Sequence, residues 1–301
     1  MGVGVIVPDF LVIGAYKSGT TALHHYLRAH PALFVPERKE PSFYAFVGAS
    51  TPFDHPAAAQ SVRDPGAYDR LFAGAAPGQL LGEVSPAYMA VSSACERIVK
   101  GAPGARLIAI LRDPVGRAYS DYLMYRRDGL EREPTFLQAL ELQSVRDPAN
   151  DPTSRYIATG RYAEQLEPYF QAFPRQQLHV LLHEDLRDDR GSALRALFRF
   201  LGVDADIALD EQVPANVSGV PASAGLRLAY AARRRAQRFL GPIVPPDLKR
   251  RVDAQLQRRL VREPMPAEAR DLLTELYRED VQHLAELLGR DLSGWLRSEK
   301  P

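Results

Sequence analysis

Short runs of apolar residues alternate with longer stretches of helical spacing over most of the chain. The runs are typical of strands that are buried on both faces, as in a parallel sheet. They are Phe10–Ile13, Gln79–Val84, Arg106–Leu111 and Leu178–Leu182, with a shorter candidate at Leu33–Val35. The stretches with helical spacing are residues 20–29, 93–99, 114–127, 135–143, 162–173 and 192–201. Strands that alternate with helices predict parallel βαβ units with right-handed crossovers.

The predicted fold is α/β, a P-loop-like three-layer arrangement in which helices flank a central parallel sheet. A length of 301 residues allows one large domain or two small ones, and we expect a single domain over 1–301. Its core would cover about residues 8–203, and a loop with a helical cap would cover about 204–301. The remaining predictions are helices at about 68–72, 226–240, 248–260 and 267–288, and irregular chain at 36–44, 48–65 and 215–223.

The composition excludes several classes of function. A formal net charge of +1 gives no general attraction for nucleic acid. Cys95 is the only cysteine, so an intrachain disulfide and a Cys-rich metal site are excluded. The sequence starts without the features of a signal peptide and has no apolar run of membrane-spanning length. We therefore expect a cytoplasmic protein without a transmembrane segment or a nucleic-acid partner, and its oligomeric state stays open.

The loop after the first predicted strand has the features of an anion-binding site. Gly14 and Gly19 frame a tight turn, and Thr20 and Thr21 begin the helix that follows. Backbone N–H groups of such a loop, together with the positive end of the helix, attract a phosphate-like anion. The glycine spacing is that of a Walker A loop, but Thr20 stands where that motif has its lysine, and Lys17 lies inside the loop. The loop is therefore not expected to bind Mg-ATP.

Two other predicted strands also end on polar residues. Glu83 and Ser85 lie at the end of one, and Arg112 directly follows another. Because ligands of open α/β sheets bind beyond the carboxyl ends of the strands, these residues should share a site with the glycine loop. The guanidinium of Arg112 suits a phosphate bidentately. Ser120 lies two helical turns later and can add a hydroxyl donor to the same anion.

These segments resemble, in the same order, the donor-binding motifs of sulfotransferases that use 3′-phosphoadenosine 5′-phosphosulfate (PAPS). The run Lys17-Ser18-Gly19-Thr20-Thr21 resembles their 5′-phosphosulfate loop, and residues 111–122 resemble the strand and helix that hold the 3′-phosphate. The segments 82–88, 162–166 and 173–175 are also similar to that family, closest to the branch with heparan sulfate N- and 3-O-sulfotransferase domains. The resemblance implies PAPS as co-substrate, no metal, and in-line transfer of a sulfuryl group to a hydroxyl or amine of a carbohydrate or small natural product.

The same resemblance implies roles in the donor site. Lys17 would be catalytic, as a mobile ammonium that follows the charge developing on the bridging oxygen. The residues that bind the donor would be Lys17, Ser18, Gly19, Thr20 and Thr21 at the 5′-phosphate, and Arg112 and Ser120 at the 3′-phosphate. A late loop with Ser218 and Gly219 takes the place of the family's second 3′-phosphate loop, although it lacks the usual Lys or Arg.

The acceptor side leaves more alternatives. Glu40 lies in the segment Lys39-Glu40-Pro41-Ser42-Phe43-Tyr44, which is similar to the segment whose glutamate is the acceptor base in the heparan sulfate branch. The candidates for contact with the acceptor are Lys39, Phe43, Tyr44 and Glu83, and the rival bases are His24, His25 and Glu83. That branch has a Lys at the position of Val84 in its 3-O-sulfotransferases and a His near Met124 in its N-sulfotransferases, so the resemblance does not fix the acceptor.

Two other functions remain as alternatives. A P-loop nucleotide kinase would depend on Mg-ATP and would carry a lysine at the position of Thr20. A sulfotransferase-like module that binds nucleotide or glycan without turnover would not need the intact set of Lys17, Arg112 and Ser120. Titration with 3′-phosphoadenosine 5′-phosphate (PAP), ATP and Mg-ATP separates the three functions.

Overall fold

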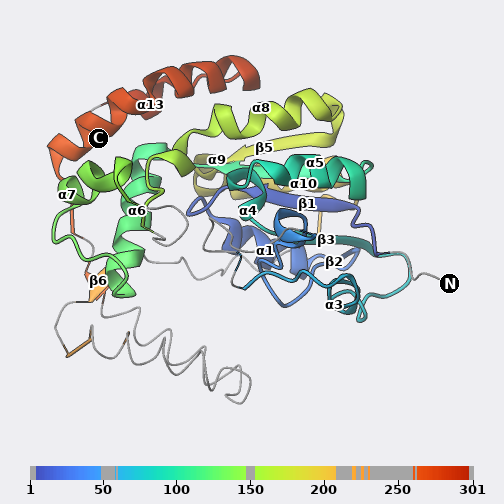
Figure 1. Ribbon diagram of the computed structural model, residues 1–301. Helices are drawn as coiled ribbons and strands as arrows, with labels where there is room; N and C mark the ends of the chain where they lie inside the picture. Colours follow the sequence, from blue (N-terminus) through green and yellow to red (C-terminus); the bar gives the residue numbers. More distant parts are fainter. Residues whose placement is uncertain are drawn as a thin grey trace.

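A parallel sheet forms the centre of the molecule (Figure 1). The structure, a computed structural model, describes residues 5–48, 58, 60–146, 153–207, 219–221, 225, 226, 230, 260, 261 and 263–297. The strands of the sheet are β1 (Phe10–Gly14), β2 (Leu33–Phe34), β3 (Leu80–Val84), β4 (Arg106–Leu111) and β5 (Leu178–Leu182). Their order is β2-β3-β1-β4-β5, and every neighbouring pair is parallel. The predicted strands and their parallel arrangement are confirmed.

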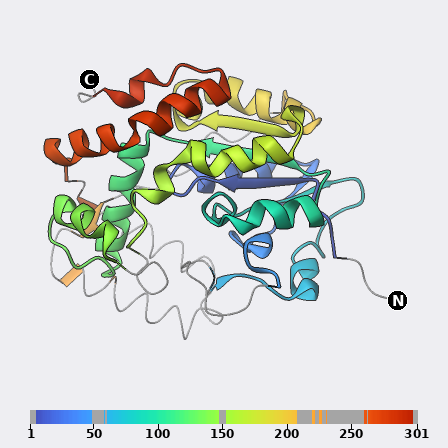
Figure 2. The same cartoon turned by 45° about the horizontal axis from the view of Figure 1, so that its top comes forward.

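Helices cover both faces of the sheet, because the side chains of each strand alternate between the faces. On the central strand β1, Phe10 and Val12 join one buried cluster, while Leu11 and Ile13 join another. The first cluster is completed by α1 (Thr20–Ala29), α9 (His183–Asp188) and α10 (Arg190–Leu201). The second includes α4 (Ala87–Ala90), α5 (Ser93–Gly101) and α8 (Tyr162–Ala172). Figures 1 and 2 show these layers, which confirm the predicted three-layer fold.

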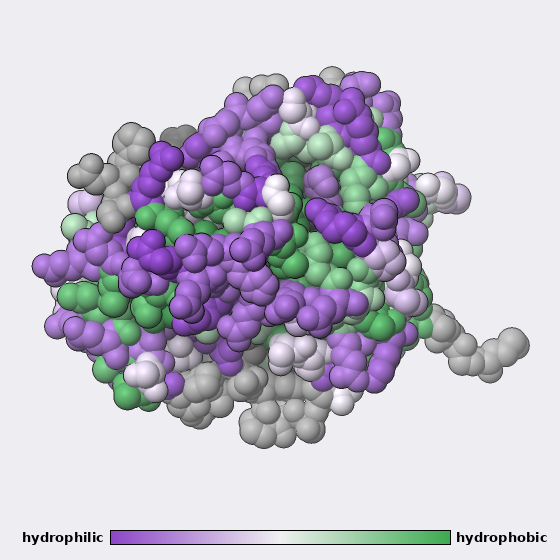
Figure 3. Space-filling model, turned by 90° about the horizontal axis from the view of Figure 1, so that it is seen from above, coloured by the Kyte–Doolittle hydropathy of each residue, from purple (hydrophilic) through white to green (hydrophobic). Residues whose placement is uncertain are grey.

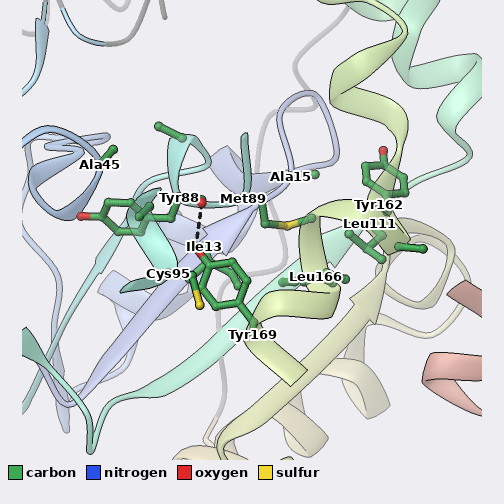
Figure 4. Packing of buried hydrophobic residues seen from close by; sticks show 14 of the residues in the cluster. Ile13, Ala15, Ala45, Tyr88, Met89, Cys95, Leu111, Tyr162, Leu166 and Tyr169 are labelled. Carbon is green, nitrogen blue, oxygen red and sulfur yellow. Dashed lines mark hydrogen bonds between the residues drawn. The ribbon is translucent and has the colours of Figure 1, made fainter. Parts of the chain in front are cut away.

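The C-terminal helix α13 (Ala267–Leu288) packs against α8 (Figure 1). The Asp280 carboxylate accepts hydrogen bonds from the N–H groups of Ala163 (3.2 Å) and Glu164 (3.3 Å) in the first turn of α8. Helix α8 is linked in turn to α4, since the Tyr169 hydroxyl donates to the Tyr88 carbonyl at 2.7 Å (Figure 4). The predicted helix at 267–288 is confirmed.

Shorter elements complete the described part of the chain. They are α2 (Phe43–Phe46), α3 (Pro65–Arg70), α6 (Pro114–Arg127), α7 (Phe136–Glu141), 3-10 turns at Leu142–Ser144, Ala158–Gly160, Arg175–Gln177 and Ser293–Leu296, and the antiparallel strands β6 (Val220–Pro221) and β7 (Leu260–Val261). β6 packs against α6 (Figure 1). Helix α3 begins earlier than expected because the Asp64 side chain caps it and Pro65 occupies its first turn.

Several local predictions differ from the structure. Phe43 and Tyr44 were expected to be irregular but belong to α2, whose residues are all buried. Val220–Pro221 lies in a predicted loop and Leu260 at the end of a predicted helix, yet their segments pair as β6 and β7. This pairing joins parts of the chain that are distant in sequence, so local pattern does not reveal it. The rest of 215–223, most of 48–65, and nearly all of the helices expected at 226–240 and 248–260 lie outside the described residues. The single-domain boundaries stay a prediction.

Seen from the side of α13, the molecular surface is largely hydrophilic, with apolar side chains gathered in small areas (Figure 3). On α13 itself, Leu272 and Leu276 are exposed by 40% and 37%. No helix among the described residues combines the length and the apolar character that a membrane span requires.

Candidate active site

The loop between β1 and α1 reaches across the carboxyl ends of β4 and β5. Gly19 precedes α1 with a φ of 106°, in the left-handed region that favours glycine. A Cβ at Gly19 would lie 3.3 Å from both the His183 Cδ2 and the Ile110 Cδ1 atoms. Ile110 belongs to β4, and His183 begins α9 directly after β5. The backbone conformation therefore strongly favours glycine at this turn, and the close packing adds to that preference.

The first turn of α1 presents the polar groups expected of an anion seat. Ser18 is fully buried, and its hydroxyl lies 3.5 Å from the Tyr162 hydroxyl of α8. Thr20 is buried and Thr21 is exposed. The N–H groups at the start of this 10-residue helix carry the positive end of its dipole. The contact of Ser18 with Tyr162 therefore supports the loop on the side of α8. The N–H and hydroxyl groups of the loop and of the first turn of α1 lie at the carboxyl end of β1.

Lys17 lies within this loop, with a φ of 62°. Its ammonium is 3.4 Å from the Met124 sulfur of α6. Burial lowers the pKa of Lys17, the Asp121 carboxylate opposes this, and the guanidinium groups of Arg127 and Arg112 lower the pKa further. Lys17 and Arg112 thus lie within range of each other's charge, although they follow different strands. A multiply charged anion that neutralises both cations would be favoured at such a site.

Arg112 and Ser120 belong to the unit formed by β4 and α6. Arg112 directly follows β4 and is partly exposed. A Cβ on Gly116 would lie 3.5 Å from its Nη2 atom, so the guanidinium lies over the first turn of α6. Ser120 is 5% exposed. The Asp113 side chain accepts from the Val115 N–H at 3.0 Å, which caps α6 and fixes how the helix leaves the strand.

Lys39 connects the anion seat with Glu40. Its ammonium donates to the hydroxyls of Thr20 (3.3 Å) and Thr21 (2.9 Å) and to the Glu40 carboxylate (2.9 Å). The side chains of Lys39 and Glu40 are 24% and 37% exposed, so their ion pair alone contributes little stability. It does hold the Glu40 carboxylate next to the start of α1.

The segment with Glu40 is attached to the end of β3. The Glu40 N–H donates to the Val84 carbonyl at 3.0 Å, although Glu40 has a φ of 59°. Burial, followed by the nearby Glu40 carboxylate, raises the pKa of Tyr16 in the β1–α1 loop. Glu40 therefore lies, like Lys17 and Arg112, at the carboxyl ends of the strands of the sheet.

The rival bases are placed differently. His24 is 8% exposed, its Nε2 lies 2.9 Å from the Pro36 carbonyl oxygen, and burial lowers its pKa. His25 is exposed on α1 and lies edge-on to the ring of Tyr26. Glu83 is 1% exposed, and its carboxylate accepts hydrogen bonds from serine and tyrosine hydroxyls of the core. Of the four candidates, Glu40 is the one that is both partly exposed and ion-paired with a lysine that contacts the first turn of α1.

The rings of Phe43 and Tyr44 belong to the core, which contradicts their expected role as acceptor contacts. Each residue is 3% exposed. The Phe43 ring stacks on Tyr68 with centroids 4.1 Å apart, and Tyr44 lies edge-on to Tyr88 at 6.0 Å. The short helix α2 turns both rings inward, whereas an irregular loop was expected.

The structure adds residues that sequence reasoning missed. His183 contacts the glycine loop and Asp121 lies within the electrostatic reach of Lys17. The position of His183 could have been predicted, because it directly follows a predicted strand and ligands bind beyond the carboxyl ends of the strands. The proximity of Asp121 to Lys17 could not have been predicted from the sequence, because it depends on how α6 packs. Ser218 lies outside the described residues, whereas Gly219 packs closely on β7, with a Cβ that would be 2.9 Å from the Val261 carbonyl oxygen.

Comparison with known proteins identifies the family. The model described as "Sulfotransferase family" matches residues 8–206, a range that contains Lys17, Glu40 and Arg112. The chain belongs to the sulfotransferase family. The resemblance seen in its sequence motifs is therefore confirmed.

Relatives of known activity support this assignment. Heparan sulfate glucosamine 3-O-sulfotransferase 3B1 of Mus musculus is 30% identical over 199 residues, which are 65% of this chain and 46% of that protein. Bifunctional heparan sulfate N-deacetylase/N-sulfotransferase 2 of Bos taurus is 25% identical over 307 residues, 97% of this chain and 31% of that protein. The chain thus spans less than half the length of these two relatives. The solved structure of a sulfotransferase from Alicyclobacillus acidocaldarius matches with a TM-score of 0.72 and 29% identity, covering 97% of this chain and 100% of that one.

Proposed function

We propose that this protein transfers a sulfuryl group from PAPS to a hydroxyl or amine of a carbohydrate or a small natural product. One observation carries the proposal. In a member of the sulfotransferase family, Lys17 lies in the loop that leads to α1, and Arg112, which directly follows the neighbouring strand β4, is near enough for its charge to lower the pKa of Lys17. A donor with a 5′-phosphosulfate and a 3′-phosphate carries two anionic groups. The first suits Lys17 and the N-terminus of α1, and the second suits Arg112.

The donor site is formed by two loops that follow neighbouring strands. The N–H groups of Ser18 to Thr21 and the threonine hydroxyls hold the 5′-phosphate, as their position at the helix N-terminus favours. Arg112 and Ser120 hold the 3′-phosphate, since a guanidinium at a strand end suits bidentate contact with phosphate oxygens. Gly219, which directly precedes β6, the strand that packs against α6, contributes to the 3′ side.

The reaction is a displacement at sulfur. The acceptor oxygen or nitrogen forms a bond to sulfur as the bond between sulfur and the bridging oxygen breaks, and the electron pair stays on the 5′-phosphate. The Lys17 ammonium neutralises the charge that develops there. The Glu40 carboxylate takes the proton that the acceptor loses. Lys39 keeps Glu40 beside the 5′-phosphate seat, which favours alignment of donor, acceptor and base.

A nucleotide kinase fits the site less well. In P-loop kinases and related enzymes the Ser or Thr in the first turn of the helix binds Mg²⁺. Here the Lys39 ammonium is bound to the Thr20 and Thr21 hydroxyls. A cation of the protein itself thus lies where a magnesium ion would be required.

Transfer of labelled sulfate tests the proposal. The protein is incubated with [³⁵S]PAPS and, in turn, heparosan, glucosamine and 2-naphthol, in the presence of EDTA. We expect labelled product from at least one acceptor together with an equal amount of PAP. Transfer from [γ-³²P]ATP in Mg²⁺, with no PAP formed from PAPS, would support the kinase instead. PAP binding without turnover on any acceptor would support the non-catalytic module.

A further inference from the structure

A buried carboxylate lies beneath the segment that carries Glu40. Glu83 of β3 is 1% exposed. Its carboxylate accepts a hydrogen bond from the Ser85 hydroxyl at 2.6 Å, another from the Tyr88 hydroxyl, and a longer one from the Tyr68 hydroxyl at 3.4 Å. Burying a carboxylate is costly unless it is hydrogen-bonded. The three hydroxyls therefore make the buried position of Glu83 possible.

Two of the hydroxyls that contact Glu83 also accept hydrogen bonds from the backbone of residues 40–44. The bonds from this segment to β3 and its continuation are Glu40 N–H to the Val84 carbonyl (3.0 Å), Ser42 N–H to the Ser85 hydroxyl (2.9 Å) and Tyr44 N–H to the Tyr88 hydroxyl (3.3 Å). A hydroxyl can donate to a carboxylate and accept from an amide at the same time. Glu83 therefore orients Ser85 and Tyr88 so that their lone pairs face the segment.

The segment needs this support because its backbone is strained. Glu40 and Ser42 have φ values of 59° and 52°, which are unfavourable for residues other than glycine and persist where the surroundings hold them. The supporting side is itself fixed. The Ser85 N–H donates to the Val12 carbonyl of β1 at 2.9 Å. The hydroxyl of Tyr169, a residue of α8, donates to the Tyr88 carbonyl (Figure 4).

We propose that Glu83 is a positioning residue for sulfuryl transfer, which acts through Ser85 and Tyr88 to hold residues 40–44 and thereby keeps the Glu40 carboxylate at the start of α1. The inference rests on the proposed function in one respect, the role of Glu40 as acceptor base. It gives Glu83 no contact with the acceptor and no proton to transfer.

The structural part of the proposal is tested by amide hydrogen exchange of the full-length protein. Ser85→Ala, Tyr88→Phe and Glu83→Gln each interrupt the connection, and exchange in a peptide that covers residues 39–46 should accelerate about tenfold or more. Exchange in α1 should stay unchanged. Tyr68→Phe is the matched control, because the Tyr68 hydroxyl contacts Glu83 but is not among the acceptors of the three segment N–H bonds. Unchanged exchange in Ser85→Ala and Tyr88→Phe would overturn the proposal.

The kinetic part uses PAP formation from PAPS, measured with heparosan, with 2-naphthol and with water as acceptor. Ser85→Ala should lower kcat by about tenfold to a hundredfold, because small displacements of a catalytic group are costly. The KM for PAPS and the affinity for PAP should stay within about twofold, which also shows that the variant is folded. In a Glu40→Gln background, Ser85→Ala should cause no further loss.

The outcomes separate this proposal from the function on which it rests. An equal loss from Ser85→Ala in both backgrounds would show that the network does not act through Glu40, and would overturn the positioning role. Full turnover of Glu40→Gln alone would instead remove Glu40 as the base, and with it the catalytic part of the inference. In that case, faster exchange at residues 39–46 in the Ser85, Tyr88 and Glu83 variants would still show that Glu83 stabilises this segment.

Discussion

The ammonium of Lys39 lies 2.9 Å from the Thr21 hydroxyl in the first turn of α1. The same ammonium lies 2.9 Å from the Glu40 carboxylate, so one cation joins the proposed phosphate seat to the proposed base. We expect Lys39→Ala to weaken PAP binding about threefold to tenfold, because a partly exposed charged hydrogen bond is lost. Turnover should fall by more. The neighbouring Arg38, which donates to the Gln60 carbonyl at 2.7 Å, is the control, and Arg38→Ala should leave both quantities unchanged.

Lys17 should affect rate more than binding. Its charge is needed most as the bridging bond breaks, so Lys17→Ala should lower kcat by about a hundredfold or more and weaken PAP binding much less. Single-turnover kinetics and calorimetry measure the two quantities. A variant whose kcat stays within a few-fold of wild type would exclude Lys17 from the mechanism.

The pH dependence of Lys17 provides a second test. Burial, reinforced by Arg127 and Arg112, lowers the pKa of Lys17 from its usual 10.5, so the ammonium is lost as pH rises through that lowered value. We expect kcat/KM for PAPS to decline on the alkaline side at a pH below 10.5. Lys17→Arg should move this decline upward, because a guanidinium stays protonated. An alkaline decline at the same pH in both proteins would assign it to another group.

Glu40→Gln keeps the shape of the side chain but removes its basicity. Turnover should fall by about 10²–10⁴-fold, the usual contribution of a positioned base, with PAP affinity within about twofold of wild type. His24→Ala and His25→Ala are the matched comparisons, and both should stay active. His24→Ala should lower the melting temperature, since it loses the bond to the Pro36 carbonyl. Loss of turnover in a histidine variant but not in Glu40→Gln would transfer the role of base.

The stability of the protein should depend on pH through Glu83. Burial raises the pKa of Glu83 to about 7, against the opposing effect of its hydroxyl partners. In the unfolded chain the carboxyl titrates near its usual 4.5, so between these values the folded protein binds more protons. The contribution of Glu83 to the free energy of unfolding therefore falls as pH rises from about 4.5 to about 7, by about 3 kcal/mol.

Thermal unfolding of wild type and Glu83→Gln at pH 5 and pH 8 measures this effect. Glutamine does not titrate, so the melting temperature of wild type should fall relative to that of the variant between the two pH values. Tyr68→Phe, which keeps the carboxylate, should follow wild type. A difference between Glu83→Gln and wild type that is the same at both pH values would contradict the raised pKa.

The strands and most helices could be predicted because their signals are local. Helix α1 begins and ends as expected, since Gly19 precedes it and Pro31 follows it closely. Arg112 and Glu83 were assigned to strand ends from apolar runs alone, and the structure puts them there. The loop that we propose for donor binding was recognisable because glycine and lysine spacing reflects what the backbone must do around an anion.

Other features depend on tertiary contacts that no short window of sequence contains. The rings of Phe43 and Tyr44 were expected to face an acceptor, but Tyr68 and Tyr88 supply partners for them in the core. The contact of Lys39 with Thr21 and the support of residues 40–44 by Glu83 join segments that only folding brings together. The order of the strands is likewise set by the crossovers rather than by any one strand.

The measurement that tests the central claim most directly is the calorimetric comparison of PAP with adenosine 5′-phosphate, which differ by the 3′-phosphate alone. Without Mg²⁺, wild type should bind PAP roughly tenfold to a hundredfold more tightly, because a charged hydrogen-bond partner typically contributes about 1.5–3 kcal/mol. Arg112→Ala should abolish most of this preference. Arg106→Ala, at the other end of β4, where Nη1 donates to the Leu201 carbonyl at 2.8 Å, should retain it. Equal affinity of wild type for the two nucleotides would contradict the assignment of a PAPS site.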